Sequence, residues 1–386
     1  MGQNIVMCWS SDERGVLVIF VPHYFLGNYC ASEGSRTAQG RDNEAFIQGL
    51  ISGTRRRSRE ELFAVSERLD VSPTFIKLKT ALTEEHQVLA AVEQLIRRYG
   101  LSYVESRAVL LFDIVEFSLY TPFEQASQLN SLSYSLNSAY NKLLAQGVEI
   151  NFARTTTGDG YYVWNRDLGP DANRDLFYFM LLVVADNAVA RAASRGNTVP
   201  IVRTGFHIGG HYELYQAEGI NPSVFSYIVG DVTIDLARMV DKAQAHQIMI
   251  GDFTCEQPRR EGDGDVPPST VATPAYVSGC NRDLSLLRGV QLSGKNIEAI
   301  GCRLTENPDK NAIPGPRRFR IVDKHGLVRH TYTLQIVMDL AGHNLSLGLD
   351  DSAALAQPGE DEQRTRVPPK APAPPASTEE LIDDLA

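Results

Sequence analysis

The feature that most constrains the fold is a regular alternation of strand-like and helix-like segments between residues 107 and 250. Residues 107–114 are apolar almost throughout, which is typical of a buried strand. Two long helical patterns follow, over 122–146 and 173–194, and shorter β-rich runs separate them. The resulting order, β-α-β-β-α-β-α-β, predicts an α+β fold in which helices pack against one sheet.

Turn and cap residues mark where several of these elements begin and end. Thr121-Pro122 places a capping residue before a proline at the first helical position, and Gly147 ends the same helix. Asp159-Gly160, between two β-rich runs, predicts a hairpin. The remaining elements are expected as strands at 201–208 and 248–250, a loop at 210–226, a helix at 231–245 and a closing hairpin from 318–322 and 330–338.

The segments on either side of this pattern suggest three regions. Residues 1–100 are expected to form a partly helical N-terminal extension, and 101–345 a catalytic domain with an inserted surface loop at about 254–275. Residues 350–386 are rich in Pro, Ala, Glu and Asp, a composition that predicts a disordered tail. The run Arg55-Arg56-Arg57 is expected in a solvated loop, and a partner-binding role is the alternative interpretation.

Composition narrows the class of partner. A formal net charge of -10 argues against a nucleic-acid binder. The five cysteines form no CxxC pair, so neither a disulfide framework nor a zinc site is expected. We expect the protein to work in a reducing compartment. No run reaches about 18 consecutive apolar residues, the length of a membrane span. We therefore expect a cytoplasmic protein with neither membrane nor nucleic acid as partner.

Two aspartates lie where carboxylates are costly unless they are used. Asp113 ends the apolar strand, and Asp159 stands at the hairpin tip between two glycines. In a β-α-β-β unit these two places lie side by side, so the carboxylates can converge on a pair of cations. Hard oxygen ligands suit Mg²⁺ or Mn²⁺, and two such ions can drive an in-line displacement at phosphorus. The alternatives are a helix-proximal cap for Asp113 and a plain turn residue for Asp159.

Four ordered segments resemble the catalytic domains of class III adenylate and guanylate cyclases. Phe112–Ser118 resembles their first metal motif and Thr157–Val163 their second. Val202–Gly209 is similar to the strand that carries a phosphate-contacting arginine, and Gly230–Met239 to the helix that carries the transition-state arginine. The resemblance implies a ferredoxin-like fold, a nucleoside triphosphate substrate and two Mn²⁺ or Mg²⁺ ions per site. It also implies a head-to-tail homodimer with active sites at the interface.

The same resemblance assigns residue roles. Asp113 and Asp159 would bind the metals together with the backbone carbonyl of Ile114. Arg203 would contact the terminal phosphates, with an edge-strand surface position as the alternative. Lys324 would contact the triphosphate, with a surface-turn lysine as the alternative.

The helix motif contributes Arg238, which would stabilise charge that grows on the α-phosphate. An i,i+3 pair with Asp235 is the alternative for this arginine. The chain also departs from the family pattern. Glu116 stands where the family has glycine, and Ile234 stands where it has an asparagine that contacts the ribose. Asp235 is the candidate replacement for that asparagine.

The positions that select the base hold Thr155 and Tyr227, neither the lysine–aspartate pair of adenylate cyclases nor the glutamate–cysteine pair of guanylate cyclases. A different set of polar groups can discriminate strongly between bases. These residues favour UTP or CTP as substrate and cyclic UMP or cyclic CMP as product, as in the pyrimidine cyclases of bacterial antiphage signalling. The alternatives are an adenylate cyclase, or a degenerate domain that binds nucleotide without turnover.

Overall fold

The structure is a computed structural model. It describes residues 4–31, 38–80, 82–97, 99–217, 224–257, 269–306, 315–323 and 326–348. The expected tail at 350–386, residues 258–268 of the expected loop at 254–275, and Lys324 lie outside the described residues.

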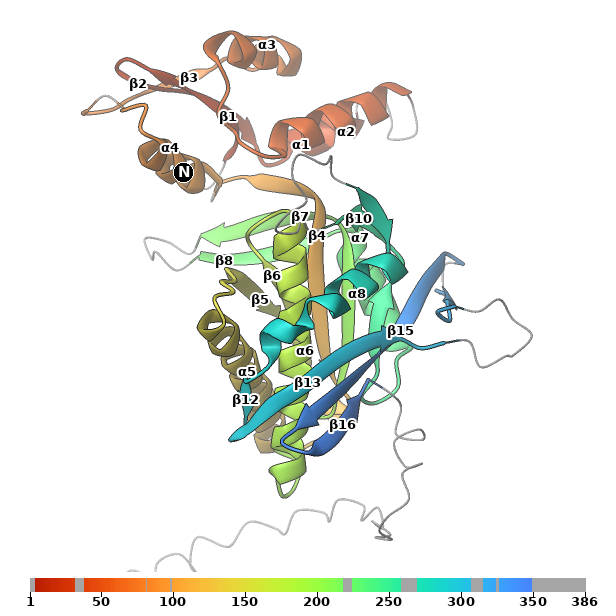
Figure 1. Ribbon diagram of the computed structural model, residues 1–386. Helices are drawn as coiled ribbons and strands as arrows, with labels where there is room; N and C mark the ends of the chain where they lie inside the picture. The colour runs from red at the N-terminus through yellow and green to blue at the C-terminus, as the bar shows by residue number, and fades with distance from the viewer. Residues whose placement is uncertain are drawn as a thin grey trace, which may run out of the picture. The chain divides into compact units, whose positions relative to one another are not determined.

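A ferredoxin-like unit forms the centre of the molecule (Figure 1). Its sheet has the order β7-β4-β6-β5, and every neighbouring pair in it is antiparallel. This order is the one that a β-α-β-β-α-β chain adopts when each helix returns across the same sheet face, so the predicted fold is confirmed. The elements are β4 (Leu101–Ile114), α5 (Pro122–Ala145), β5 (Phe152–Thr156), β6 (Gly160–Asn165), α6 (Pro170–Ala193) and β7 (Val202–Ala217).

Further strands widen the sheet beyond β7. β9 runs parallel to β7, and β15 pairs with β9 in the antiparallel direction. The expected closing hairpin is confirmed as β14 and β15, which pair with each other. The added elements are β9 (Ile248–Gly251), β12 (Gln291–Leu292), β13 (Lys295–Leu304), β14 (Phe319–Val322), β15 (Val328–Leu340) and β16 (His343–Leu347), with α8 (Thr273–Arg282) and the short turns η1 (Phe117–Leu119) and η2 (Leu284–Leu287).

Two expected loops contain strands. The prediction of a loop at 210–226 is wrong at both ends of that range, because β7 continues to Ala217 and β8 (Val224–Val229) pairs with β7. Gly210 leaves room for the Tyr103 side chain, since a Cβ there would lie 2.9 Å from the Tyr103 hydroxyl. At the ends of the loop expected over 254–275, β10 (Thr254–Glu256) and β11 (Thr270–Ala272) pair with each other.

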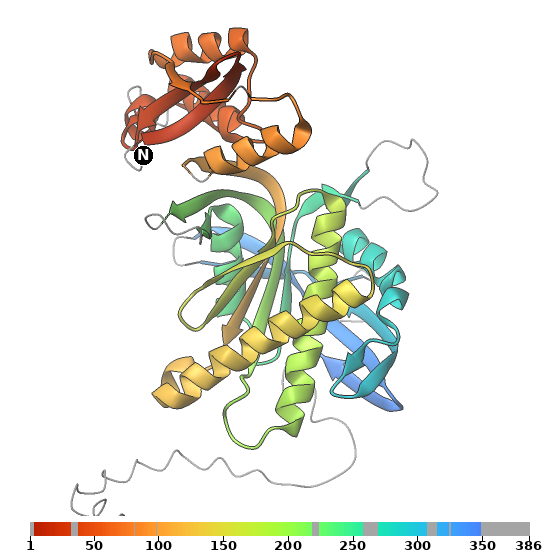
Figure 2. The same ribbon diagram turned by 90° about the vertical axis from the view of Figure 1, so that its left-hand side faces the viewer.

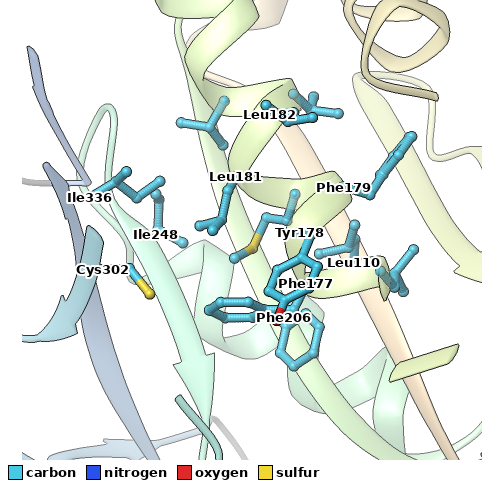
Figure 3. Packing of buried hydrophobic residues seen from close by; sticks show 14 of the residues in the cluster. Leu110, Phe177, Tyr178, Phe179, Leu181, Leu182, Phe206, Ile248, Cys302 and Ile336 are labelled. Atoms are coloured by element: carbon cyan, nitrogen blue, oxygen red, sulfur yellow. The ribbon is translucent and has the colours of Figure 1, made fainter. Parts of the chain in front are cut away.

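Helices α5 and α6 cover one face of the sheet (Figure 2). Figure 3 shows Phe177 and Leu181 of α6 beside Phe206 and Ile248 of the sheet, and all four side chains are fully buried. Within the described residues, α6 is the one helix that is long and apolar enough to cross a membrane, with a mean hydropathy of 1.5 over its best window. Because 61% of that window is buried inside the protein, core packing accounts for its composition.

The opposite face of the sheet carries one helix, α7 (Asp231–Asp241). Its apolar side, including Val232 and Leu236, packs on Val109 and Leu111 of β4. Gly205 of β7 makes this close packing possible, because a Cβ there would lie within 2.9 Å of Leu236.

Residues before β4 build a separate small sheet with its own helices. Strands β1 (Asn4–Asp12), β2 (Gly15–Pro22) and β3 (Thr74–Lys77) pair in the order β1-β2-β3. The helices are α1 (Phe25–Ala31), α2 (Ala38–Ile51), α3 (Arg59–Leu69) and α4 (His86–Arg97). This part of the chain is therefore helical in part, as expected, but organised by a sheet.

The prediction that Arg55-Arg56-Arg57 lies in a solvated loop is wrong for Arg55. Arg55 is fully buried, and its guanidinium donates hydrogen bonds to the carbonyls of Val6 and Leu101. These hydrogen bonds to Nη1 and Nη2 offset part of the cost of burying the cation, while the buried Nε has no partner among the described residues. The pairing joins distant segments, so local composition gave no sign of it.

Candidate active site

Asp113 lies on the α7 face of the sheet at the end of β4. Successive residues of a strand point to opposite faces. Phe112 and Ile114 pack in the core under α5 and α6, whereas Leu111 packs under α7. Asp113 therefore shares the face of Leu111, and its side chain is only 14% exposed.

Asp159 is held beside Asp113 by backbone pairing. Gly160 is the cross-strand partner of Asp113, and a Cβ at position 160 would lie 1.9 Å from the Phe112 carbonyl oxygen. Only glycine lets β4 and β6 approach this closely. The Ile114 amide donates a 2.9 Å hydrogen bond to the Asp159 carbonyl, so the two acidic segments are adjacent, as the β-α-β-β pattern predicted.

Arg203 joins the same cluster. It is the cross-strand partner of Asp113, and its Nε donates a 2.8 Å hydrogen bond to Asp113 Oδ2, which Nη2 also contacts. The alternative of an edge-strand position is wrong, because β7 lies between β9 and β4. Burial raises the pKa of Asp113, Arg203 opposes that rise, and the charge of Asp159 adds to it.

This donor set fits Mg²⁺ or Mn²⁺ better than a closed transition-metal site. No group of three or more His, Cys, Asp or Glu side chains gathers as a metal site in the described part of the chain. Mg²⁺ is commonly held by one or two carboxylates, with substrate phosphates and water completing its shell. Asp113 and Asp159 provide two carboxylates that repel each other electrostatically, and a cation would relieve that repulsion.

Glu116 follows the cluster in an unusual backbone conformation. Its φ angle is +56°, the left-handed region in which glycine has no steric penalty and other residues lose about 1 kcal/mol. The segment therefore makes the turn for which glycine is suited, while the Glu116 side chain is exposed. The amide of Leu119 donates to the Glu116 carbonyl at 2.9 Å and closes the turn.

Asp235 belongs to a second charged cluster, which sequence reasoning missed. It accepts a hydrogen bond from Arg329 Nε, and His207 Nε2 lies 3.5 Å from its other oxygen. Arg329 also contacts Asp323 at 2.9 Å. Burial alone would raise the pKa of Asp235, but His207 and Arg329 outweigh it and the net pKa is lowered. These residues come from three segments far apart in sequence, so no local motif revealed them.

Arg238 stands on α7 without the partner that the alternative interpretation gave it. Within the described residues no ion pair joins it to Asp235, which is engaged by Arg329 and His207. Its Nε atom is buried and has no hydrogen-bond partner in that part of the chain. An unsatisfied buried donor costs about 1–3 kcal/mol, so an anion placed here would be stabilising.

The two candidate base-selecting residues lie on strands at the edges of the unit. Thr155 of β5 pairs across from Tyr162, whose hydroxyl donates to the Thr233 carbonyl of α7 at 3.0 Å. Tyr227 of β8 is 44% exposed, and β5 approaches β8. Among the described residues, no hydrogen bond or ion pair joins Thr155 or Arg238 to the cluster at Asp113. The chain therefore carries two separate groups of candidate residues.

Comparison with known proteins gives likeness in structure only. No family model matches the chain, and no curated protein matches it in sequence. The guanylate cyclase domain of RhGC from Catenaria anguillulae, in complex with GTP, is 18% identical, with 44% of this chain and 96% of that chain covered and a TM-score of 0.30. A dimeric guanylyl cyclase domain of the RhoGC fusion protein from Blastocladiella emersonii is 14% identical, with 61% and 96% covered and a TM-score of 0.34.

The adenylyl cyclase CyaB from P. aeruginosa is 14% identical, with 45% of this chain and 94% of that chain covered and a TM-score of 0.30. The chain is thus similar in structure to adenylyl and guanylyl cyclase domains. The fold assignment rests on the strand order of the chain itself.

Proposed function

We propose that this chain is a nucleotidyl cyclase, which converts a nucleoside triphosphate into a 3′,5′-cyclic nucleotide and pyrophosphate. The observation that carries the proposal is the convergence of Asp113, Asp159 and Arg203 at one end of the sheet. Two Mn²⁺ or Mg²⁺ ions bound there would activate the 3′-hydroxyl and stabilise the leaving oxygen. The residues that would hold them are Asp113, Asp159 and the Ile114 carbonyl.

Arg203 has a role in the phosphate part of the site. Its guanidinium now lies against Asp113, where it limits the repulsion between the two carboxylates. A planar guanidinium also forms bidentate hydrogen bonds with phosphate. We infer that Arg203 contacts the terminal phosphates once a cation has taken its place at Asp113.

Arg238 supports the proposal that the active enzyme is a homodimer. Its buried Nε lacks a hydrogen-bond partner among the described residues. A two-fold dimer uses the same surface patch of both chains, so a residue of one chain that contacts a second residue of its partner does so twice, once in each direction. We propose that Arg238, Thr155 and Tyr227 of one chain complete the site at Asp113 of its partner.

The substrate that we propose is UTP or CTP, with cyclic UMP or cyclic CMP as product. Thr155 offers a small hydroxyl and Tyr227 a bulky phenol on the strands β5 and β8, which approach each other. We propose that the cyclic pyrimidine nucleotide is a second messenger, and that the chain produces it in the cytoplasm as part of bacterial antiviral defence. Lys324 stays a proposed triphosphate contact.

The decisive experiment offers the purified chain each of the four nucleoside triphosphates with Mn²⁺ and identifies the products by mass. The proposal predicts a cyclic pyrimidine nucleotide and pyrophosphate. Cyclic AMP as the sole product would make the chain an adenylate cyclase and overturn the pyrimidine assignment. Tight nucleotide binding without pyrophosphate release would overturn the proposed turnover.

One observation favours that last outcome as a second candidate function, a nucleotide-binding sensor. Ile234, where cyclases carry a ribose-contacting asparagine, is 46% exposed and offers no hydrogen bond. Asp235, the candidate replacement, is engaged by Arg329 and His207 instead. Substitution Ile234→Asn separates the two functions, because a cyclase limited at this position gains rate and a sensor stays without turnover.

A further inference from the structure

A cavity of about 710 Å³ lies in the N-terminal region, and no residue of the candidate active site lines it. Its walls come from the end of β1, the segment 54–59 and the start of α4. The lining includes the basic side chains of Arg56 and Arg59, and Arg56 Nη2 donates a 3.1 Å hydrogen bond to the Ser11 hydroxyl. Leu89 and Ala90 add apolar surface to the lining.

The charge balance of the lining favours an anion. Three guanidiniums, of Arg56, Arg57 and Arg59, line the cavity against the single carboxylate of Glu93. Glu93 is already used by the fold, because it accepts a 2.8 Å hydrogen bond from Trp9 Nε1 and a 2.7 Å hydrogen bond from the Arg55 amide. Glu93 also pairs at 3.4 Å with Arg97, which is not in the lining, so its charge is shared with a cation outside the cavity.

Two of these arginines hold partners that a ligand can replace. Arg56 pairs at 2.6 Å with Glu84, whose side chain is 68% exposed. Arg59 pairs at 3.1 Å with Asp12 and is itself 66% exposed. Exposed ion pairs contribute about 0–1 kcal/mol, so a phosphate that binds both guanidiniums can displace the two carboxylates. Arg57 differs, because its guanidinium donates to the carbonyls of Thr54 and Arg56.

We propose that this cavity binds a small phosphorylated ligand of nucleotide size. Its volume lies within the range of about 300–1,000 Å³ that is typical of small-molecule sites. Arg56 and Arg59 would bind the phosphate, and Leu89 and Ala90 would contact the rest of the ligand. The carboxylates that oppose binding are Asp12 and Glu84, with Glu61, which caps the first turn of α3.

The cavity is connected to β4, the strand that carries Asp113. Glu93 holds the backbone amide of Arg55, and the Arg55 guanidinium donates to the carbonyl of Leu101, the first residue of β4. A ligand that orders the 54–59 segment would therefore also stabilise the start of β4. That this connection regulates cyclisation rests on the proposed function, whereas binding itself does not.

Calorimetric titration of the full chain with ADP in EDTA tests the binding, because the active site then lacks its cations. We expect one ADP per chain and an affinity that falls with added salt. Arg56→Ala and Arg59→Ala should each weaken binding about tenfold or more, whereas Arg68→Ala, which breaks the comparable surface pair with Asp42, should not. Melting curves of the four proteins confirm that each is folded.

Absence of ADP binding, or equal affinity in the Arg56 and Arg59 variants and wild type, would overturn the proposal. So would a loss of ADP binding in Arg203→Ala, which would place the phosphates of ADP in the active site. A single-stranded RNA that binds this face more tightly than ADP would assign it to a polyanion instead. Hydrogen exchange tests the connection, which predicts slower exchange at the start of β4 with ADP in wild type and no change in Arg59→Ala.

Discussion

The two faces of the central sheet use the same strands for different purposes. On the α5–α6 face, Phe112, Phe177 and Phe206 are fully buried, and the rings of Phe177 and Phe206 meet edge to face at 5.4 Å. On the α7 face, neighbouring positions of those strands hold Asp113 and Arg203. Because strand residues alternate between faces, one register places the larger core on one side and the charged residues, beside a smaller apolar contact with α7, on the other. Substitutions on the two faces should therefore have separable effects.

The largest expected effect is on stability and lies on the α6 side. Phe177→Ala should lower the free energy of unfolding by about 3–5 kcal/mol, because it leaves a cavity in a close-packed core. Urea unfolding measures it. The control Phe123→Ala removes a side chain that is 74% exposed and should change stability by less than about 0.5 kcal/mol. Equal losses in both variants would contradict the assignment of the core to this face.

The next effect is on rate and lies on the α7 side. Arg238→Ala should lower the rate of cyclisation about 10²–10³-fold, as removal of a donor to transition-state charge does, with little change in the melting temperature. If the site is shared between chains, mixing inactive Arg238→Ala with inactive Asp113→Asn should restore about a quarter of wild-type activity, since half of the dimers then hold one intact site. A mixture as inactive as its components would refute the shared site.

A smaller effect concerns pH and a buried ion cluster on β4 and β7. His211 is fully buried beside Arg107, and burial and that positive charge lower its pKa to about 4. The unfolded chain therefore takes up a proton first as pH falls, and stability should drop between about pH 6.5 and 4, by about 3 kcal/mol for this group. His211→Gln should flatten this slope, whereas the exposed His86→Gln should not. An unchanged slope in His211→Gln would show that other groups control it.

The smallest effect is on base selection. Thr155→Ala should change the ratio of kcat/KM between the best and second-best triphosphate by about tenfold, the usual worth of one polar contact to a substrate. Competition assays with paired substrates measure it. Arg154→Ala, on the other face of the same strand, is the matched control. A ratio that moves only in the control would exclude Thr155 from the base site.

The sequence predicted the central elements well because their signals are local. The apolar run before Asp113, the Thr121-Pro122 cap and the Asp159-Gly160 turn each act within a few residues, and all three appear in the structure as expected. The approach of Asp113 and Asp159 followed from topology. That prediction needed no knowledge of side-chain packing.

The errors concern interactions between distant segments. Arg55 is buried because carbonyls near residues 6 and 101 accept its hydrogen bonds, a fact that composition cannot show. The contact of Asp235 with Arg329 likewise joins residues 94 positions apart. Long-range pairings of this kind become visible only once the strand order is known.

The most direct test of the central claim is the rate of cyclic nucleotide and pyrophosphate formation by wild type, Asp113→Asn and Asp159→Asn with Mn²⁺. Each substitution removes a carboxylate that would bind the metal ions, which should cost several kcal/mol of transition-state stabilisation. The rate should therefore fall about 10³-fold or more in each variant, with melting temperatures close to wild type. Wild-type rates in both variants would contradict the assignment of these carboxylates to the metal site.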